Sequence, residues 1–156
     1  MEHNLRDFIA TIKPNKRLLA LDVGVKKVGL ALSDNSLTIA SPYGLITRTN
    51  FKDDVKKIAN ILDEFEIAGL VIGLPITMNG QEGDSCVRTR EFVKKILDKI
   101  DIAIYMQDER LSTQAATRIL IETNINRKKR ELLDDKIAAC FILQGVLDKI
   151  KHLYSS

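Results

Sequence analysis

The chain has 156 residues, of which 45% are hydrophobic and 29% are charged. This length suits one domain with a proper core, and this composition argues against a disordered chain. The formal net charge of +3 at pH 7 is too small to indicate a nucleic-acid partner by itself, but it permits one if the basic residues cluster. We expect one domain over residues 1–156, with its core at about 17–150 and an N-terminal extension at 1–16.

A membrane location and an oxidising compartment are both disfavoured. The longest apolar runs, residues 69–74 and 137–143, are far shorter than the ~20 residues of a membrane-spanning helix. The N-terminal residues carry acids and have no uninterrupted apolar core, so we expect no signal peptide. Cys86 and Cys140 form no CxxC pair, which argues against a zinc site or a disulfide framework. We therefore expect a cytoplasmic protein without a membrane partner.

The first 16 residues predict a short helix. Apolar side chains at Leu5, Phe8, Ile9 and Ile12 follow helical spacing. We expect this helix to pack on the outside of the domain.

Residues 18–34 predict a β-hairpin with an acid at the tip of its first strand. An apolar run at 18–21 ends on Asp22, a turn containing Gly24 follows, and a second apolar run covers 28–32. Gly24 would permit a positive φ or the close approach of a phosphate or a metal ion. Asp22 could therefore face a ligand while its strand stays buried.

The rest of the chain predicts a third strand and then alternating helices and strands. The third strand lies within residues 37–49, with Pro42 at an edge or entry, and completes an antiparallel meander. The elements expected after it are a helix from residue 50 or 53 to about 66, a strand at 69–74, a helix from 84 or 85, a strand at 102–106, a helix from 112 or 113 to about 121, a basic loop at 123–131 and a last helix at 132–153. This order predicts an α/β fold in which helices flank a mixed five-stranded sheet, made of the antiparallel meander plus parallel strands.

Acidic residues recur where strands end and where the last helix begins. In chain order they are Asp22, Asp108 with Glu109, and Asp134 with Asp135. Ligands of open α/β sheets gather beyond the carboxyl ends of the strands, so we expect these acids on one rim. Carboxylates gathered there repel one another unless a cation neutralises them, and hard oxygen ligands suit Mg²⁺ or Mn²⁺. Two such ions could activate a water for phosphodiester hydrolysis.

Helical periodicity does not choose between Asp134 and Asp135. Asp135 shares a face with Ala138 and Ala139, whose small side chains would allow close approach to the sheet, whereas Asp134 lines up with Ile137. Both acids could instead simply favour the dipole at the helix N-terminus.

Basic and polar residues are expected around the same rim. They are Lys26, Lys27, Asn79, Arg110, Arg127, Lys128, Lys129 and Arg130. Each could hold backbone phosphates without reading base sequence, although Asn79 could be an ordinary turn residue and the run at 127–130 a solvated loop. Aromatic residues are only 5% of the chain and Trp is absent, which disfavours a base-stacking platform for single strands. We expect a structured or double-stranded nucleic acid as partner.

Four stretches together resemble the YqgF/RuvX family, which is described as pre-16S rRNA nucleases and as Holliday junction resolvases with an RNase H-like fold. In chain order the stretches are LDVGVKKVGLALSD, VIGLPITMNG, DERLST and DDKIAACFILQ. The resemblance implies an RNase H-like three-layer fold and a catalytic, metal-binding set of Asp22, Glu109 and Asp135. Asp134 stands where similar proteins often have an apolar residue, so it stays an alternative helix ligand, as Asp108 does for Glu109.

The resemblance and the residues together predict a hydrolase, a nuclease that uses Mg²⁺ or Mn²⁺, with two ions expected. The expected substrate is the 5′ end of pre-16S rRNA in a pre-ribosomal particle, and a Holliday junction, a branched DNA, is the alternative. A non-catalytic RNA-binding protein of ribosome assembly is a further alternative. A phosphate-binding module of the actin and sugar-kinase type is another, but such enzymes need two domains around a nucleotide. No dimer face is marked by the apolar pattern, so we expect a monomer rather than a homodimer.

Overall fold

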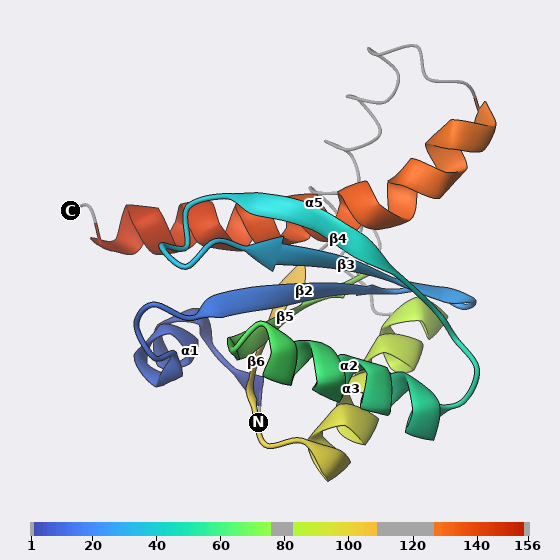
Figure 1. The fold of residues 1–156 in the computed structure, drawn as a ribbon, viewed down its shortest axis with the longest axis horizontal. Helices are drawn as coiled ribbons and strands as arrows, with labels where there is room; N and C mark the ends of the chain where they lie inside the picture. The colour runs from blue at the N-terminus through green and yellow to red at the C-terminus, as the bar shows by residue number, and fades with distance from the viewer. Residues whose placement is uncertain (1, 76–82, 109–126, 155–156) are drawn as a thin grey trace.

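A computed structural model describes residues 2–75, 83–108 and 127–154, with side chains for 3–75, 83–108 and 137–154. Figure 1 shows a twisted sheet with helix α5 across one face and helices α2 and α3 across the other. The strands are β1 (Glu2–His3), β2 (Arg17–Val23), β3 (Lys27–Ser33), β4 (Ala40–Thr47), β5 (Ile67–Leu74) and β6 (Ala103–Asp108). The helices are α1 (Leu5–Thr11), α2 (Phe51–Glu64), α3 (Asp84–Lys99) and α5 (Arg127–Tyr154).

The sheet is mixed, as predicted. In the described residues its strand order is β1-β6-β5-β2-β3-β4, with β2, β3 and β4 antiparallel and with β5 and β6 parallel to β2. The two-residue β1 adds an edge strand beside β6, one more than the five expected. Because β2, β5 and β6 run in parallel, their carboxyl ends meet at one edge of the sheet. We call this edge the C-terminal rim; it contains Val23, Leu74 and Asp108 as the last residues of those strands.

The two faces of the sheet belong to two separate parts of the core, because side chains alternate along a strand. The face under α2 and α3 carries large aliphatic side chains; they include Leu19, Leu21, Leu30, Ile72 and Ile104. The face under α5 carries many smaller ones; it includes Leu18, Ala20, Ala31, Val71 and Ala103. Buried residues of α5, among them Ala139 and Ile142, pack on this second face.

Helix α1 confirms the predicted N-terminal helix but not its place outside the core. Asn4 caps it, because the backbone N–H of Asp7 donates to Asn4 Oδ1 over 2.9 Å. Phe8 is fully buried on the α5 side of the sheet. A Cβ at Gly69 would lie 2.8 Å from the Phe8 ring. The missing side chain at Gly69 therefore lets a residue of the N-terminal extension fill the core.

The start of α2 agrees with the sequence prediction, whereas the start of α5 does not. Of the two predicted caps of α2, Asn50 is the one observed: it accepts a hydrogen bond from the backbone N–H of Asp53 over 2.9 Å. Helix α5 begins at Arg127 rather than at residue 132, so Arg127, Lys128, Lys129 and Arg130 belong to a helix and not to the predicted loop. Lys, Arg and Glu are good helix formers, so their polarity alone does not end a helix. The helix predicted from residue 112 or 113 lies outside the described residues.

Candidate active site

Asp22 lies at the C-terminal rim, one residue before the end of β2. In the antiparallel pair it stands opposite Gly29 of β3. On its other side Leu21 pairs with Ile72 of β5, so the next rung places Asp22 beside Gly73. Alternation along β2 puts Asp22 on the same face as Ala20, the face under α5. Strand pairing on both sides therefore sets the position of this half-buried carboxylate.

The glycines beside Asp22 shape the space around it. Gly29 and Gly73 are buried, and by alternation they occupy the α5 face on the two strands that flank Asp22. Neither position carries a side chain that would crowd the carboxylate. Glycine inside a strand commonly marks a place where a ligand or another backbone approaches closely. The arrangement fits a carboxylate that binds a ligand from the α5 side.

Gly24 does not adopt the positive φ that was one of the two roles expected for it. Its φ lies outside the left-handed region. Its backbone N–H donates to Lys27 O over 2.9 Å, and a Cβ at Gly24 would lie 2.8 Å from that oxygen. The glycine therefore allows the β2–β3 turn itself to close. Lys26 and Lys27 follow at this turn, the first exposed and the second half-buried, close to Asp22 along the chain.

The end of β6 separates Gln107 from Asp108. Gln107 lies on the α5 face, where its Oε1 accepts a hydrogen bond from Lys149 Nζ of α5 over 2.8 Å. Asp108 pairs with Leu74 as the last residue of β6, and alternation places it on the face under α2 and α3. Asp108 thus shares the rim with Asp22 but not its face. Glu109 itself lies outside the described residues.

Helix α5 crosses the face that carries Asp22. Gln144 anchors it to the start of β4: the backbone N–H of Ala40 donates to Gln144 Oε1 over 2.9 Å, and Gln144 Nε2 donates to Thr38 O over 3.0 Å. In Figure 1 the first turns of α5 lie toward the side of the β2–β3 turn. Asp134 and Asp135 belong to this part of the helix, about two turns after Arg127. The dipole acts within the first turn, which argues against the alternative that they only complement the helix N-terminus.

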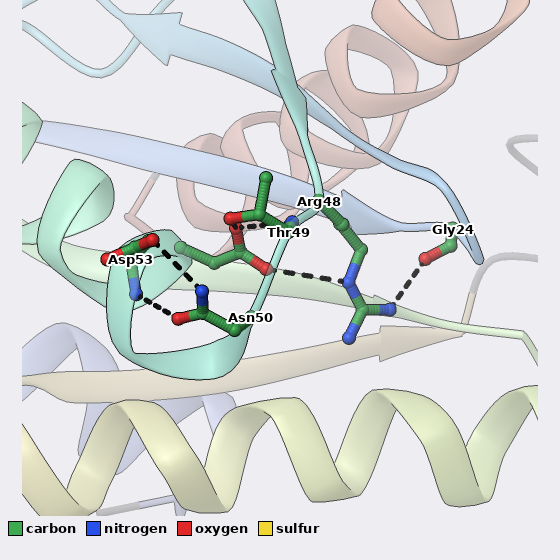
Figure 2. Close-up of polar contacts among 6 residues, drawn as sticks. Gly24, Arg48, Thr49, Asn50 and Asp53 are labelled. Carbon is green, nitrogen blue, oxygen red and sulfur yellow. Dashed lines mark hydrogen bonds and ion pairs between the residues drawn. The ribbon is translucent and has the colours of Figure 1, made fainter.

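An arginine that the sequence analysis did not single out holds the β2–β3 turn (Figure 2). Arg48 Nη1 donates to Gly24 O over 2.8 Å, and Arg48 Nε lies 3.8 Å from Asp54 Oδ2. Asp54 is 1% exposed and also accepts a hydrogen bond from the backbone N–H of Thr49 over 3.2 Å. The sequence did hold a signal, because Asp54 precedes Val55 on the apolar side of α2, and a buried carboxylate needs a partner.

The other predicted site residues lie outside what the structure describes. Asn79 and Arg110 are outside the described residues. The side chains of Asp134 and Asp135 and of the basic run from Arg127 to Arg130 are outside them as well, although their helix is described. Within the described residues, no three His, Cys, Asp or Glu side chains gather as a metal-binding group. None of the helices described is long and apolar enough to cross a membrane.

Residues 16–149 match the family model described as "RuvX: Holliday junction resolvase". The chain belongs to the RuvX family. A relative from Paramagnetospirillum magneticum is 45% identical over 142 residues, which cover 91% of this chain and 92% of the relative. One from Rickettsia africae is 40% identical over 150 residues, which cover 96% and 97%. Both relatives carry the name "Putative pre-16S rRNA nuclease".

Solved structures show that this RuvX-family chain has the predicted RNase H-like α/β fold. Thermus thermophilus RuvC in complex with a Holliday junction substrate aligns with a TM-score of 0.52 at 13% identity, over 86% of this chain and 96% of RuvC. The human cytomegalovirus terminase nuclease domain aligns with a TM-score of 0.53 at 12% identity, over 96% and 95% of the two chains. At such low identity these likenesses establish the fold alone.

Proposed function

We propose that this RuvX-family protein is a metal-dependent nuclease that hydrolyses phosphodiester bonds in structured RNA, with Asp22, Glu109 and Asp135 as its metal-binding acids. The observation that carries the proposal is the place of Asp22. It is a half-buried carboxylate at the C-terminal rim, flanked by Gly29 and Gly73 on the face that α5 crosses. Ligand sites of open α/β sheets form at this rim.

The described residues fit a divalent cation at Asp22. Hard carboxylate oxygens suit Mg²⁺ or Mn²⁺, and Gly29 and Gly73 place no side chain of their own beside the carboxylate. Glu109 is proposed as the second acid on the family resemblance, and Asp108, which lies on the other face of the sheet from Asp22, is the alternative. Of the two acids in α5, Asp135 is proposed on the family resemblance, with Asp134 as the alternative. A pair of such ions would supply an activated water and charge neutralisation at the leaving oxygen.

The chain's own cations have separate tasks in this proposal. Exposed Lys26 and half-buried Lys27 lie at the β2–β3 turn, next to Asp22 along the chain. They would hold backbone phosphates near the rim without reading bases. Lys26 or Arg110 would also offset charge that develops on the phosphoryl oxygens. The basic run from Arg127 to Arg130, which belongs to α5, is proposed as a further phosphate-binding segment.

The proposed substrate is the 5′ end of pre-16S rRNA in a pre-ribosomal particle. Its support is the shared name of relatives that are 40 to 45% identical over nearly the whole chain. The description of the matching family model favours a Holliday junction as the second candidate. A resolvase must cut two strands symmetrically, which requires two active sites and hence a dimer. Processing of one RNA strand needs only a monomer.

The test is cleavage of end-labelled precursor 16S rRNA and of a four-way DNA junction by the purified protein, with Mg²⁺, Mn²⁺ or EDTA. We expect cleavage of the RNA with metal and none with EDTA. Asp22→Asn keeps the side-chain size but removes the charge that would bind the metal ions, so cleavage should be almost completely lost, with an unchanged circular dichroism spectrum. Asp63→Asn, an exposed acid on α2, is the matched control and should cleave like the native protein.

Three results would contradict the proposal. Native cleavage rates in Asp22→Asn would show that Asp22 is not part of the active site. Cleavage of the DNA junction alone, by a protein of dimer mass, would replace RNA processing with junction resolution. Binding of precursor rRNA that is insensitive to metal and to Asp22→Asn, with no cleavage, would leave an RNA-binding assembly protein.

A further inference from the structure

A surface pocket of about 340 Å³ lies beside the β2–β3 turn, on the opposite face of the sheet from Asp22. It is formed by the turn residue Val25, by Arg48 and the N-terminal residues of α2, and by Arg88 of α3. Val25 is 65% exposed, and Arg88 is half-buried. The pocket therefore joins the turn that follows Asp22 to the groove between α2 and α3.

The charges of this pocket favour an anion. Its carboxylate, Asp54, is buried and already bonded to Thr49 and paired with Arg48. None of the described residues forms an ion pair with Arg88. A guanidinium group has five N–H donors on three nitrogens, and two nitrogens of Arg48 are engaged by Gly24 O and Asp54. Two arginines thus line the pocket and give it a positive charge; the Arg48 side chain is 15% exposed and also lies over the Phe92 ring, 5.0 Å from its centroid.

A second surface pocket, of about 380 Å³, continues the first along the groove. The two pockets share Phe51, whose ring has Arg48 on it at 5.7 Å and Lys95 at 5.5 Å. Exposed lysines line the second pocket: Lys52, Lys95 and Lys99. Its carboxylate is the exposed Asp98. We name the five cations of both pockets the α2–α3 track; they are Arg48, Lys52, Arg88, Lys95 and Lys99.

We propose that the α2–α3 track binds the phosphodiester backbone of the nucleic acid outside the point of cleavage. This inference rests on the proposed nuclease function. Val25 follows Asp22 by three residues, so their Cα atoms are at most about 11 Å apart. That limit corresponds to the axial rise of about three nucleotides in one strand of a duplex. The first pocket, which Val25 lines, would therefore hold a phosphate within about three nucleotides of the cleaved bond, and the lysines would hold the flanking helix.

The shape of the track favours a polyanion over a small anion. Its cations form a row along two helices rather than a closed cup, and a row of cations matches the repeated phosphates of one strand. The aromatic ring in the row, Phe51, already packs against Arg48, Lys95 and the Phe92 ring, whose centroid lies 6.1 Å away. It is thus not an open platform for stacking a base. The track should hold the backbone without base preference.

Binding is tested separately from cleavage, with a fluorescein-labelled RNA duplex of about 20 base pairs in EDTA. Fluorescence anisotropy gives the dissociation constant between 50 and 200 mM NaCl. The slope of log affinity against log salt is negative, and each lost phosphate contact should make it less negative by about 0.9. We expect its magnitude to decrease by about one for Arg88→Gln and by about two for the double variant Lys95→Gln with Lys99→Gln.

The control is Lys94→Gln, which removes one exposed cation of α3 outside both pockets. Because Lys94 contacts no phosphate in this proposal, Lys94→Gln should have nearly the native slope. Thermal melts should confirm that all variants are folded. Track variants with the same slope as Lys94→Gln would overturn the inference. If the native protein cleaves its substrate and that result is also found, the proposed function stays supported and only the α2–α3 track is wrong. If the protein never cleaves but the track variants show a weaker salt dependence, the nuclease function is wrong and the α2–α3 track is still a nucleic-acid-binding surface.

Discussion

The two faces of the sheet use side chains of different size, and the difference separates stability from site construction. Under α2 and α3 the strands carry mainly Leu, Ile and Val, packed against Phe92 and Ile58. Under α5 they carry Ala20, Ala31 and Ala103, facing Ala139 of the helix. Large side chains fill one interface to the density of a protein interior. Small side chains let α5 lie close to the sheet. On this face, Asp22 is the last residue of β2.

One strand supplies both interfaces. In β2 the odd positions, Leu19 and Leu21, enter the core under α2 and α3, while Leu18, Ala20 and Asp22 alternate on the α5 side. A change at an odd position should therefore affect mainly stability. A change of volume on the α5 side should also displace the helix that carries Asp135.

The largest effect on stability is expected for Leu21→Ala. Leu21 is fully buried under α2 and α3, and truncation to Ala leaves a cavity that costs about 2–5 kcal/mol of unfolding free energy. Urea denaturation measures this loss. Cleavage measured well below the melting temperature should stay within about twofold of native, because Leu21 points away from the α5 face. A large loss of cleavage by folded Leu21→Ala protein would show that packing under α2 and α3 also affects the active site.

Ala139→Leu tests the other face in the opposite direction. Ala139 is fully buried against the sheet, and the added volume should cost about 1–3 kcal/mol through overpacking. It should also lower cleavage by folded protein, because α5 must shift with Asp135 on it. Ala10→Leu, on the exposed side of α1, is the matched control and should change neither quantity. Native cleavage in folded Ala139→Leu would argue against a site that depends on the close approach of α5.

The smallest effect is expected for Asp34, in the turn between β3 and β4 that leads to the α5 contacts of Thr38 and Ala40. Desolvation alone would raise the pKa of Asp34, but hydrogen bonds from Ser36 Oγ and from the backbone N–H groups of Thr38 and Ile39 outweigh it and lower the pKa below the ordinary 3.8. A lowered pKa in the folded state means that the carboxylate stabilises folding above pH 3.8, and that this contribution fades as the pH falls through the folded-state pKa.

The corresponding measurement compares native protein with Asp34→Asn by urea denaturation at several pH values. The variant should be slightly less stable at pH 7, and the difference should shrink below about pH 4. A difference that stays constant down to acid pH would mean that the charge of Asp34 contributes nothing.

Much of the fold could be predicted because its signals are local. The apolar run of β5, the cap at Asn50 and the hairpin around Gly24 each lie within a few residues of sequence, and all three elements are present. The start of α5 was misplaced because a run of Lys and Arg was treated as a loop, although these residues favour helices. Phe8 was placed outside the core because its partner, the gap above Gly69, lies far away in sequence.

In the candidate site, too, local features could be predicted and features that join distant residues could not. Asp22 at the end of a strand, with Lys26 and Lys27 at the next turn, could be predicted from the order of residues. The α2–α3 track could not, because its members come from the β4–α2 connection, from α2 and from α3, and they meet only when these elements pack.

The sequence by itself determined the order of strands and helices from α1 to β6, the acid at the end of β2 and the membership of the RuvX family, because periodicity, turn residues and motifs are properties of short stretches. Only the tertiary structure decided that Asp22 and Gln107 share the α5 face while Asp108 lies on the other. The physical reason is strand pairing: the register between β2, β5 and β6 is set by contacts between distant residues, and a shift of one residue would exchange the two faces.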